Sequence, residues 1–215
     1  MGEEHRLRLV GAGSGRAAGC TAEGQIETAR GATAAGRSGL TSNIVEREQA
    51  MNQMERFQKL PPVDPHEMIG LWKGRGIPSG HPLDGVLENL GWFGKRFSAQ
   101  MRADALLFRG GEKRLVAIEP AWIPLRLALR FHKIGRTRAA SNLFSYLLRR
   151  LRAKGPVASL KAVPFQGVTS AAMAYDTQSI VDHFRKVDDD RLMGAMVIEG
   201  DERVYFFELE RVEEV

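Results

Sequence analysis

Cysteine is nearly absent from this sequence: its 215 residues contain one, Cys20. A single thiol excludes an intrachain disulfide and a cysteine-based zinc site, and it fits a reducing, cytoplasmic setting. Long apolar runs are also missing, because no stretch approaches the roughly 18 residues needed to cross a bilayer. The N-terminus has no apolar signal region either, so the sequence predicts neither membrane insertion nor export.

Aromatic side chains are lacking from residues 1–50, where Gly, Ala, Ser, Thr and Arg dominate. Such a segment buries too little surface to offset the entropy of ordering, so we predict a disordered tail. Gly13, Gly15 and Ala18 superficially match a dinucleotide fingerprint. The residues that follow supply neither the helix nor the acidic residue that this motif needs, so we expect no nucleotide site there.

A short amphipathic helix is predicted between Ser42 and Leu60, with Ser42 as its cap and two prolines after its end. Met51 and Met54 lie immediately before the first globular-looking residues. A translation start at one of them is therefore an alternative to a tail of fifty residues.

Acidic residues are absent from Pro120 to Tyr175, although this segment carries ten lysines and arginines. Two stretches have apolar residues at helical spacing, and they predict two helices between about residues 124 and 153. The residues expected to face the core are Leu125, Leu129 and Ile134 in one stripe and Leu143, Phe144, Leu147, Leu148 and Leu151 in the other.

The basic face of this segment has three interpretations: a solvated surface, a lid near an anionic ligand, or attachment to an anionic membrane. Recognition of single-stranded nucleic acid is disfavoured, because the arginines are accompanied by few aromatic side chains: Phe131, Phe144 and Tyr146.

The densest group of special residues lies between Asp64 and Phe97, with two tryptophans, seven glycines and three prolines. Its first part, from Ile69 to Ile77, predicts a strand with Trp72 among glycines on one face. A large aromatic residue flanked by glycines indicates close approach of another backbone or a ligand. We therefore predict a barrel or a strongly bent sheet, with Trp72 as its floor.

Ser79, His81 and Asp84 fall in a loop, since prolines and glycines interrupt this stretch. A catalytic triad within one tight loop is disfavoured, because triads are assembled from separate elements. We expect His81 and Asp84 to hydrogen-bond loop amides, and contact with a ligand is the alternative.

A strand is expected after Trp92, and within it Lys95 and Arg96 point to opposite faces, so only one of them faces a cavity. A hairpin follows, with its turn at Gly110 and Gly111. The last sixty residues predict an antiparallel meander of five strands: 157–163, 167–175, 180–187, 191–199 and 203–211.

Tyr175, Asp176, Asp182 and His183 lie in or beside this meander. Asp182 and His183 are neighbours, so one of them points inward, and we expect the other on the surface. The run from Tyr205 to Phe207 is apolar on both faces, which predicts a strand covered on one side by a helix or by the returning N-terminal segment.

These motifs resemble a known family. GLWKG, GRGIPSGHPLDG and GWFGKRF are similar to the domain family named for its Gly-x-Trp-x-Gly motif. AMAYDTQSIVDHFRKVDDDRLMGAMVIEG and YFFELER resemble its usual companion, a domain of unknown function. The resemblance covers about Met54 to Arg211, with Ser79 where the family usually has threonine. It implies no activity, cofactor or catalytic residue, and relates the Trp72 strand only distantly to the lipocalin-like and nitrobindin-like barrels that bind lipids and haem.

Taken together, we expect a mainly β protein: an antiparallel, lipocalin-like or calycin-like barrel with two inserted helices. Residues 51–215 form one domain, divided into 54–119, a basic helical insertion at 120–156, and the meander at 157–211. Eight or nine strands can enclose a small ligand.

The favoured function is binding of an apolar molecule with an anionic or polar head. One alternative is a barrel enzyme that acts on a small hydrophobic or acidic substrate with His81 and aspartates. A further alternative is membrane-surface or nucleic-acid binding through the basic helical segment, of which nucleic-acid binding is disfavoured. Metal sites are not expected, and the sequence identifies no cofactor, catalytic residue or oligomeric state. The candidate ligand-binding residues are Trp72, His81, Asp84, Trp92, Lys95, Arg96, Tyr175, Asp176 and Asp182.

Overall fold

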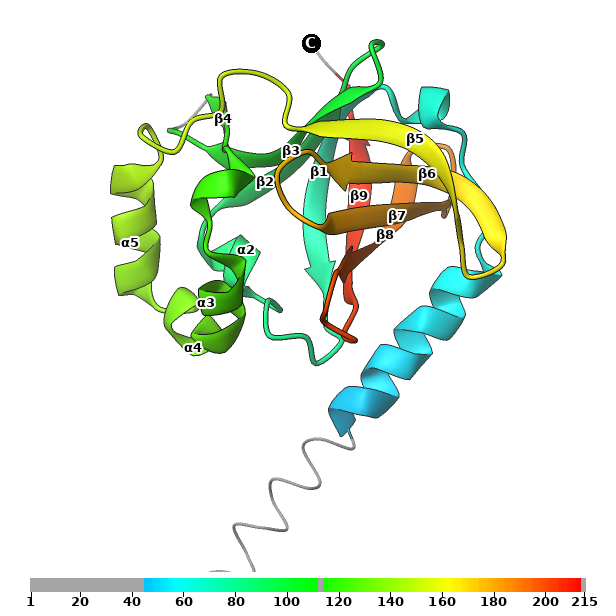
Figure 1. Cartoon of the computed structure of the whole chain (residues 1–215), viewed down its shortest axis with the longest axis horizontal. Helices are drawn as coiled ribbons and strands as arrows, with labels where there is room; N and C mark the ends of the chain where they lie inside the picture. The colour runs from blue at the N-terminus through cyan, green and yellow to red at the C-terminus, as the bar shows by residue number, and fades with distance from the viewer. Residues whose placement is uncertain (1–44, 112–113, 214–215) are drawn as a thin grey trace, which may run out of the picture. The chain divides into compact units, whose positions relative to one another are not determined.

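Nine antiparallel strands form one sheet in the computed structural model of this chain, which describes residues 45–111 and 114–213 (Figure 1). They are β1 (Gly70–Ile77), β2 (Trp92–Phe97), β3 (Arg102–Arg109), β4 (Leu115–Ala117), β5 (Ala158–Phe165), β6 (Val168–Tyr175), β7 (Ile180–Lys186), β8 (Arg191–Ile198) and β9 (Tyr205–Val212). Their order is β2-β1-β9-β8-β7-β6-β5-β3-β4, and β2 also pairs with β3. The predicted antiparallel strands are therefore confirmed.

The concave side of the sheet is packed with aromatic and aliphatic side chains. Trp72, Phe97, Phe184 and Phe207 are each at most 2% exposed and belong to one core cluster. Phe184 makes edge-to-face contacts with both Phe97 and Phe207, at centroid separations of 5.7 and 6.0 Å. Such contacts add to the hydrophobic stabilisation of the buried rings.

The glycines of β1 make room for side chains of this chain itself. A Cβ at Gly74 would lie 2.3 Å from the Trp92 ring, and one at Gly76 would lie 2.6 Å from the Tyr205 hydroxyl. The sequence correctly predicts a close approach over this face. The groups that approach are Trp92 and Tyr205, whereas we expected a backbone or a ligand.

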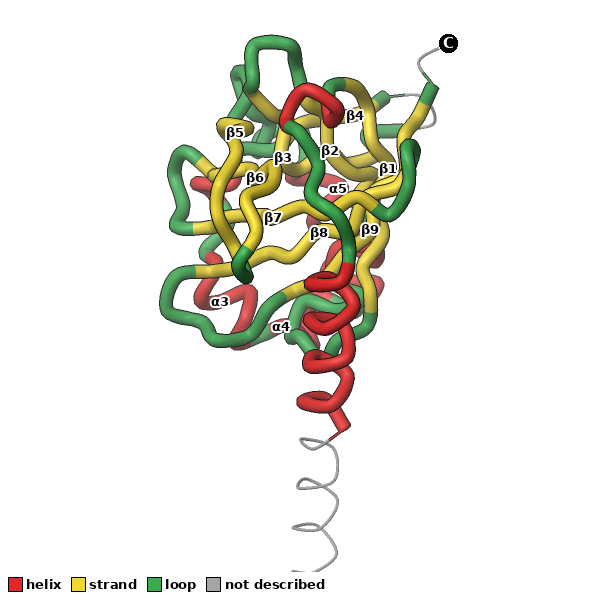
Figure 2. The backbone as a smooth tube through the Cα atoms, turned by 90° about the vertical axis from the view of Figure 1, so that its right-hand side faces the viewer, coloured by secondary structure: helices red, strands yellow, loops and turns green. Residues whose placement is uncertain are grey.

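A helix covers residues 45–59 and packs on the outer face of the sheet (Figure 2). Phe57 is fully buried, and its ring lies 6.4 Å from that of Phe206 on β9. This explains why the strand is apolar on both faces. Residues 45–50 of the predicted disordered tail belong to this helix, and the rest of that tail, including Cys20 and the Gly13 motif, lies outside the described residues.

The helical insertion between β4 and β5 contains three α-helices where two were predicted (Figure 1). The first stretch is divided into α3 (Leu125–Arg130) and α4 (His132–Gly135), because Phe131 leaves helical geometry with φ −107° and ψ 26°. The second forms α5 (Arg138–Leu147). Three further short helical segments occur in the chain: η1 (Pro65–Met68) before β1, α2 (Val86–Asn89) between β1 and β2, and η2 (Pro120–Trp122) after β4.

The predicted core stripes of the insertion are wrong at two positions. Leu125, Leu129 and Phe144 pack against the core as expected, and the Phe144 ring lies 4.8 Å from that of Phe108. Ile134 and Leu143, in contrast, are 59% and 60% exposed. The break at Phe131 rotates Ile134 away from the stripe that the sequence suggests.

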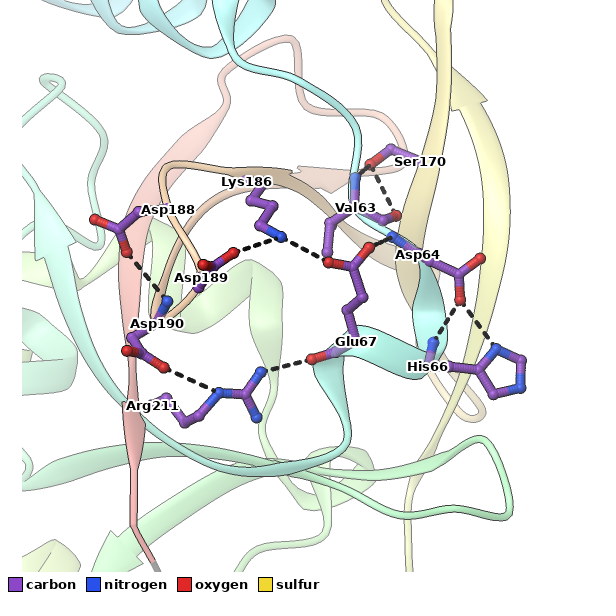
Figure 3. Close-up of polar contacts among 10 residues, drawn as sticks. All are labelled: Val63, Asp64, His66, Glu67, Ser170, Lys186, Asp188, Asp189, Asp190 and Arg211. Carbon is purple, nitrogen blue, oxygen red and sulfur yellow. Dashed lines mark hydrogen bonds and ion pairs between the residues drawn. The ribbon is translucent and has the colours of Figure 1, made fainter.

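Polar contacts fasten the segment before β1 to the strands β6, β7 and β9 (Figure 3). Lys186 Nζ lies 2.8 Å from Glu67 Oε2, and Arg211 donates to the Glu67 carbonyl over 2.7 Å. The Val63 amide donates to Ser170 Oγ on β6 over 2.9 Å. These contacts hold η1 against the strand ends and so position Trp72, whose indole Nε1 donates to the Met68 carbonyl over 2.7 Å.

Candidate functional site

Lys95, Tyr175 and Asp182 meet in the apolar interior, although they come from β2, β6 and β7. Lys95 Nζ lies 2.8 Å from Asp182 Oδ2, and their side chains are 3% and 0% exposed. The ammonium also donates to the Ala105 carbonyl over 3.0 Å and to the Tyr175 hydroxyl over 3.5 Å. Tyr175 in turn donates to Asp182 Oδ2 over 3.5 Å. We call these three residues the interior cluster.

A β-bulge brings both Trp92 and Lys95 to the interior. Residues three apart in a regular strand face opposite sides, but the pairing of β2 with β3 shifts register on both sides of Gly94. Only glycine fits there, because a Cβ would lie 2.0 Å from the Trp72 carbonyl oxygen. Trp92 and Phe207 then lie beneath the ammonium, with Lys95 Nζ 5.7 and 5.1 Å from their ring centroids.

The electrostatics of the interior cluster are dominated by burial. Burial raises the pKa of Asp182, and the nearby Lys95 ammonium opposes that shift. Burial and the Asp182 charge together raise the pKa of Tyr175 well above its ordinary value, so its hydroxyl remains a hydrogen-bond donor. A buried ion pair of this kind contributes little net stability, because desolvation offsets the attraction.

The loop between β1 and α2 is held by its own polar groups. Asp84 Oδ2 accepts from the backbone amides of Ser79 and His81, over 2.9 and 3.1 Å. The Leu83 amide donates to His81 Nδ1 over 3.1 Å. This geometry agrees with the interpretation in which His81 and Asp84 pin the turn. It also fixes the ring tautomer, because a nitrogen that accepts cannot carry the proton, so the proton of neutral His81 is on Nε2.

Several buried polar atoms near this loop and the interior cluster have no hydrogen-bond partner among the residues that the structure describes. These atoms are Ser79 Oγ, His81 Nε2, Asp84 Oδ1, Asp182 Oδ1 and the Tyr205 hydroxyl. The rings of His81 and Tyr205 lie 5.5 Å apart. Asp182 and Tyr205 share a face, because each pairs with Met196 of the intervening strand β8. Buried polar atoms are rarely left unpaired, so these five atoms mark the candidate site.

The remaining candidate residues take other positions. Trp72 and Trp92 line the interior, and the Arg211 guanidinium lies 4.2 Å from the Trp72 ring centroid. Arg96 points outward and lies 3.8 Å from Asp104. Asp176 also faces outward, where it pairs with Arg102. The structure therefore brings Lys95, Tyr175 and Asp182 together and places Arg96 and Asp176 away from them.

The predicted surface exposure of His183 is wrong. Asp182 and His183 are neighbours on β7, and Asp182 points inward. His183 lies on the outer face but is only 8% exposed, because its ring stacks on that of Phe165 with the centroids 3.9 Å apart. Burial, together with the nearby positive charge of Arg185, lowers the pKa of His183 to about 4. The outer face of β7 is thus a second covered surface.

Surface depressions lie outside the interior. One of about 610 Å³ is lined by Asp188, Asp189, Asp190, Arg191, Glu210, Arg211 and Glu213, and contains none of the predicted site residues. Within residues 45–111 and 114–213, no group of three or more His, Cys, Asp or Glu side chains is arranged to hold a metal ion. No helix in the described part of the chain is long and apolar enough to cross a membrane.

Sequence reasoning missed Tyr205 and the unpaired hydroxyl of Ser79 as members of the site. Tyr205 could have been found from strand alternation, since Tyr205, Phe207 and Leu209 occupy one face of β9 while Glu208 and Glu210 occupy the other. A buried tyrosine in that series places a hydroxyl in the interior. For Ser79 the sequence offers no comparable signal.

Comparisons with known proteins agree with the family resemblance. Residues 55–113 match a family model described as "GXWXG protein", and residues 156–211 match "Domain of unknown function (DUF4334)". A solved structure titled "Crystal structure of protein from Thermomonospora curvata" is 29% identical, covers 76% of this chain and 87% of its own, and has a TM-score of 0.55. No curated protein matches the chain. These similarities concern family and fold, and their names state no activity.

Proposed function

Since this chain is a GXWXG protein that carries a C-terminal DUF4334 domain, and neither description names an activity, we propose a function from its geometry. The proposal is that it binds a small molecule inside a closed, lipocalin-like barrel. The ligand has an apolar body and a polar head, and the head contacts His81, Asp182 and Tyr205. The unpaired polar atoms of these three buried residues carry the proposal.

Closure of the barrel is supported by the strand pairings. β2 pairs with β1 on one side and with β3 on the other, and β3 also pairs with β5. Eight strands can therefore be followed around a ring, with β4 attached outside it. On this ring β2 and β7 are opposite, separated by three strands in each direction, so the Lys95–Asp182 pair crosses the interior. The interior of an eight-stranded barrel is either filled by side chains or holds one small ligand. Because the aromatic core and the Lys95–Asp182 pair occupy the middle of this interior, we place the ligand at the end beside His81 and Tyr205.

The chemistry of the unpaired atoms defines the head group. His81 Nε2 carries a proton and the Tyr205 hydroxyl can donate, so both suit an acceptor such as a carbonyl or carboxylate oxygen. Asp182 Oδ1 is an acceptor and suits a hydroxyl or amine. Arg136 of the basic insertion donates to the Pro82 carbonyl over 3.3 Å, which places a cation next to this loop. A head that carries a carbonyl or carboxylate oxygen next to a hydroxyl or amine matches this set.

The enzyme alternative is less well supported. Burial lowers the pKa of His81 to about 4, with the positive charge of Arg203 adding to the effect. At neutral pH the ring is uncharged and a weak base, and Asp84 bonds backbone amides instead of the ring. His81 is thus suited to donate a hydrogen bond and poorly suited to abstract a proton.

A titration with decanoate tests the proposal, because its chain supplies the apolar body and its carboxylate supplies the acceptor part of the head, which faces His81 and Tyr205. Tyr205→Phe removes one donor and should weaken decanoate binding about fivefold in calorimetry, the effect of one neutral hydrogen bond. Tyr146→Phe, at a side chain that is 74% exposed, is the control and should bind like the wild type.

Urea unfolding without ligand separates binding from folding. Because the Tyr205 hydroxyl has no partner among the described residues, Tyr205→Phe should leave the free energy of unfolding equal or higher. The proposal fails if the wild type does not bind decanoate, or if Tyr205→Phe and Tyr146→Phe bind equally.

A further inference from the structure

Exposed apolar side chains are concentrated on the helical insertion. Eight large apolar residues of the described chain are strongly exposed, and six of them lie between residues 122 and 146: Trp122, Leu127, Phe131, Ile134, Leu143 and Tyr146. Their exposed fractions range from 51% to 74%. Single exposed apolar residues need no explanation, but such a concentration indicates a surface that something covers.

Basic side chains accompany these apolar ones along α3 and α4. Arg126, Arg130 and Lys133 each directly precede Leu127, Phe131 and Ile134, and all six side chains are exposed. The same basic–apolar pair thus occurs three times, at 126–127 and 130–131 around α3 and at 133–134 in α4, on both sides of the break at Phe131. Among the described residues, none of the three cations has an ion-pair partner, which is consistent with the absence of acids from 120 to 175.

We propose that the insertion docks this protein on an anionic lipid surface. The docking face consists of Trp122, Leu127, Phe131, Ile134, Leu143 and Tyr146, with Arg126, Arg130 and Lys133 beside it. An interfacial helix of this kind places apolar side chains at the acyl boundary and cations among the headgroups. The attraction of each lysine or arginine to an anionic leaflet then adds to the apolar contribution.

The insertion is already fixed to the protein core through other residues, so its exposed face is available for docking. Leu125, Leu129 and Phe144 pack against the core. Asn89 of α2 donates to the Gly135 and Thr137 carbonyls over 2.8 and 3.0 Å. Figure 1 shows α3, α4 and α5 together at one side of the sheet. The opposite faces of these helices therefore present the exposed residues.

Charge argues against two other occupants. A second copy would bring the same unpaired cations against each other in a symmetric contact, which is electrostatically unfavourable. Nucleic acid would satisfy the cations, but the exposed leucine and isoleucine side chains have no partner on a phosphate backbone. An anionic lipid surface offers headgroup charges to the cations and hydrocarbon to the apolar side chains, so it matches both parts of the docking face.

Trp122 provides a direct reporter for the full-length protein. Of the three tryptophans, Trp72 and Trp92 are buried, whereas Trp122 is 69% exposed. Vesicles of phosphatidylcholine with 30% phosphatidylserine should shift the fluorescence emission to the blue, and vesicles of phosphatidylcholine alone should shift it much less. Trp122→Phe should remove the shift but retain most of the binding in a sedimentation assay.

Two triple variants that each remove three positive charges show whether binding depends on the cations of the docking face or only on the net charge of the protein. Arg126→Gln/Arg130→Gln/Lys133→Gln should weaken binding to the phosphatidylserine vesicles on the order of 100-fold. Lys59→Gln/Arg114→Gln/Lys161→Gln removes three exposed cations elsewhere and is the matched control, which should bind within about threefold of the wild type. Replacing Leu127, Phe131 and Ile134 by Gln should also weaken binding, without loss of thermal stability.

The proposal is overturned if the wild type does not sediment with phosphatidylserine vesicles at about 0.1 M salt. It is also overturned if the two triple variants lose binding equally. A blue shift that appears without lipid and grows with protein concentration would identify a second copy as the occupant. Binding to single-stranded RNA that exceeds vesicle binding, without a Trp122 shift, would identify nucleic acid. This test does not depend on decanoate binding in the interior.

Discussion

At the scale of single residues, the protein is defined by polar groups that it buries. Lys95 and Asp182 form an ion pair that is almost fully removed from water, with Tyr175 as a third member. His81 and Tyr205 place further polar atoms in the interior without partners among the described residues. Such groups are costly in a folded chain, and the binding function that we propose would account for their place in an otherwise apolar core.

Lys95→Met should destabilise the fold strongly, because it leaves the Asp182 carboxylate buried without its counterion. We expect a loss of about 3–5 kcal/mol in the free energy of unfolding, measured with urea. The double variant Lys95→Met/Asp182→Leu should recover most of this loss, since no charge then remains buried. A single variant that costs under about 1 kcal/mol would show that water reaches Asp182.

His183→Phe should make the protein less sensitive to mild acid. In the folded state the pKa of His183 is about 4, and in the unfolded chain it is near 6.5. Between these values the unfolded chain binds a proton that the folded chain does not, so the free energy of unfolding falls as pH is lowered from 6.5 to 4.

Each histidine with such a lowered pKa changes the free energy of unfolding by up to about 1.4 kcal/mol per pH unit within this window. The wild type has two, His81 and His183, both with a pKa of about 4. The difference in unfolding free energy between the wild type and His183→Phe should therefore change across this window. A difference that is constant with pH would contradict the burial of His183.

At the scale of elements, glycines determine how closely the aromatic side chains pack on the strands. Gly194 of β8 lies under the ring of Phe207, and a Cβ there would be 2.2 Å from the ring carbon Cζ. Gly74 of β1 has the same relation to Trp92. Large residues on one strand therefore fill the space left by glycines on its neighbour, which is how a strongly curved sheet fills its interior.

Gly194→Ala should cost about 1–3 kcal/mol of stability, because the Phe207 ring must move within a packed core. Gly155→Ala is a suitable control, since a Cβ at Gly155 would have no atom within 4 Å. Thermal unfolding of the two variants measures the contrast. Equal melting temperatures would mean that the core yields more easily than these distances imply.

Most strands could be predicted from the sequence, because apolar alternation and turn residues are local properties. The five strands of the C-terminal meander and the hairpin turn at Gly110 and Gly111 agree with the structure. The helical insertion was predicted less well. Helical spacing alone cannot show that Phe131 interrupts the helix, and consequently Ile134 was assigned to the core. Leu143 lies in the separate helix α5, where it is exposed beside Phe144, which packs against the core.

The sequence predicted individual residues of the site, but it did not predict that Lys95, Tyr175 and Asp182 contact one another. Lys95, Tyr175 and Asp182 could each be proposed from strand alternation. Their meeting depends on which strands are neighbours across some ninety residues of sequence, and on the bulge at Gly94 that brings Trp92 and Lys95 to one face. Pairing over such a separation leaves no mark in the local pattern of a single sequence.

At the scale of the whole molecule, two regions explain why aromatic, apolar and basic side chains are unevenly distributed along the sequence. The interior collects aromatic side chains and a few buried polar atoms, and we assign it to a small ligand. The acid-free helical insertion collects exposed apolar and basic side chains, and we assign it to an anionic lipid surface. The two proposals rest on different residues, so either can fail without the other.

Native mass spectrometry of the full-length protein, purified from its own host without denaturation, tests the interior site most directly. We predict a discrete mass above that of the chain, which is released by acid unfolding and identified as a single small molecule with an apolar body and a polar head. The same preparation of Tyr205→Phe should carry less of it, and Tyr146→Phe should carry the wild-type amount. A wild-type protein with only the mass of its chain, and without affinity for decanoate, would contradict the account.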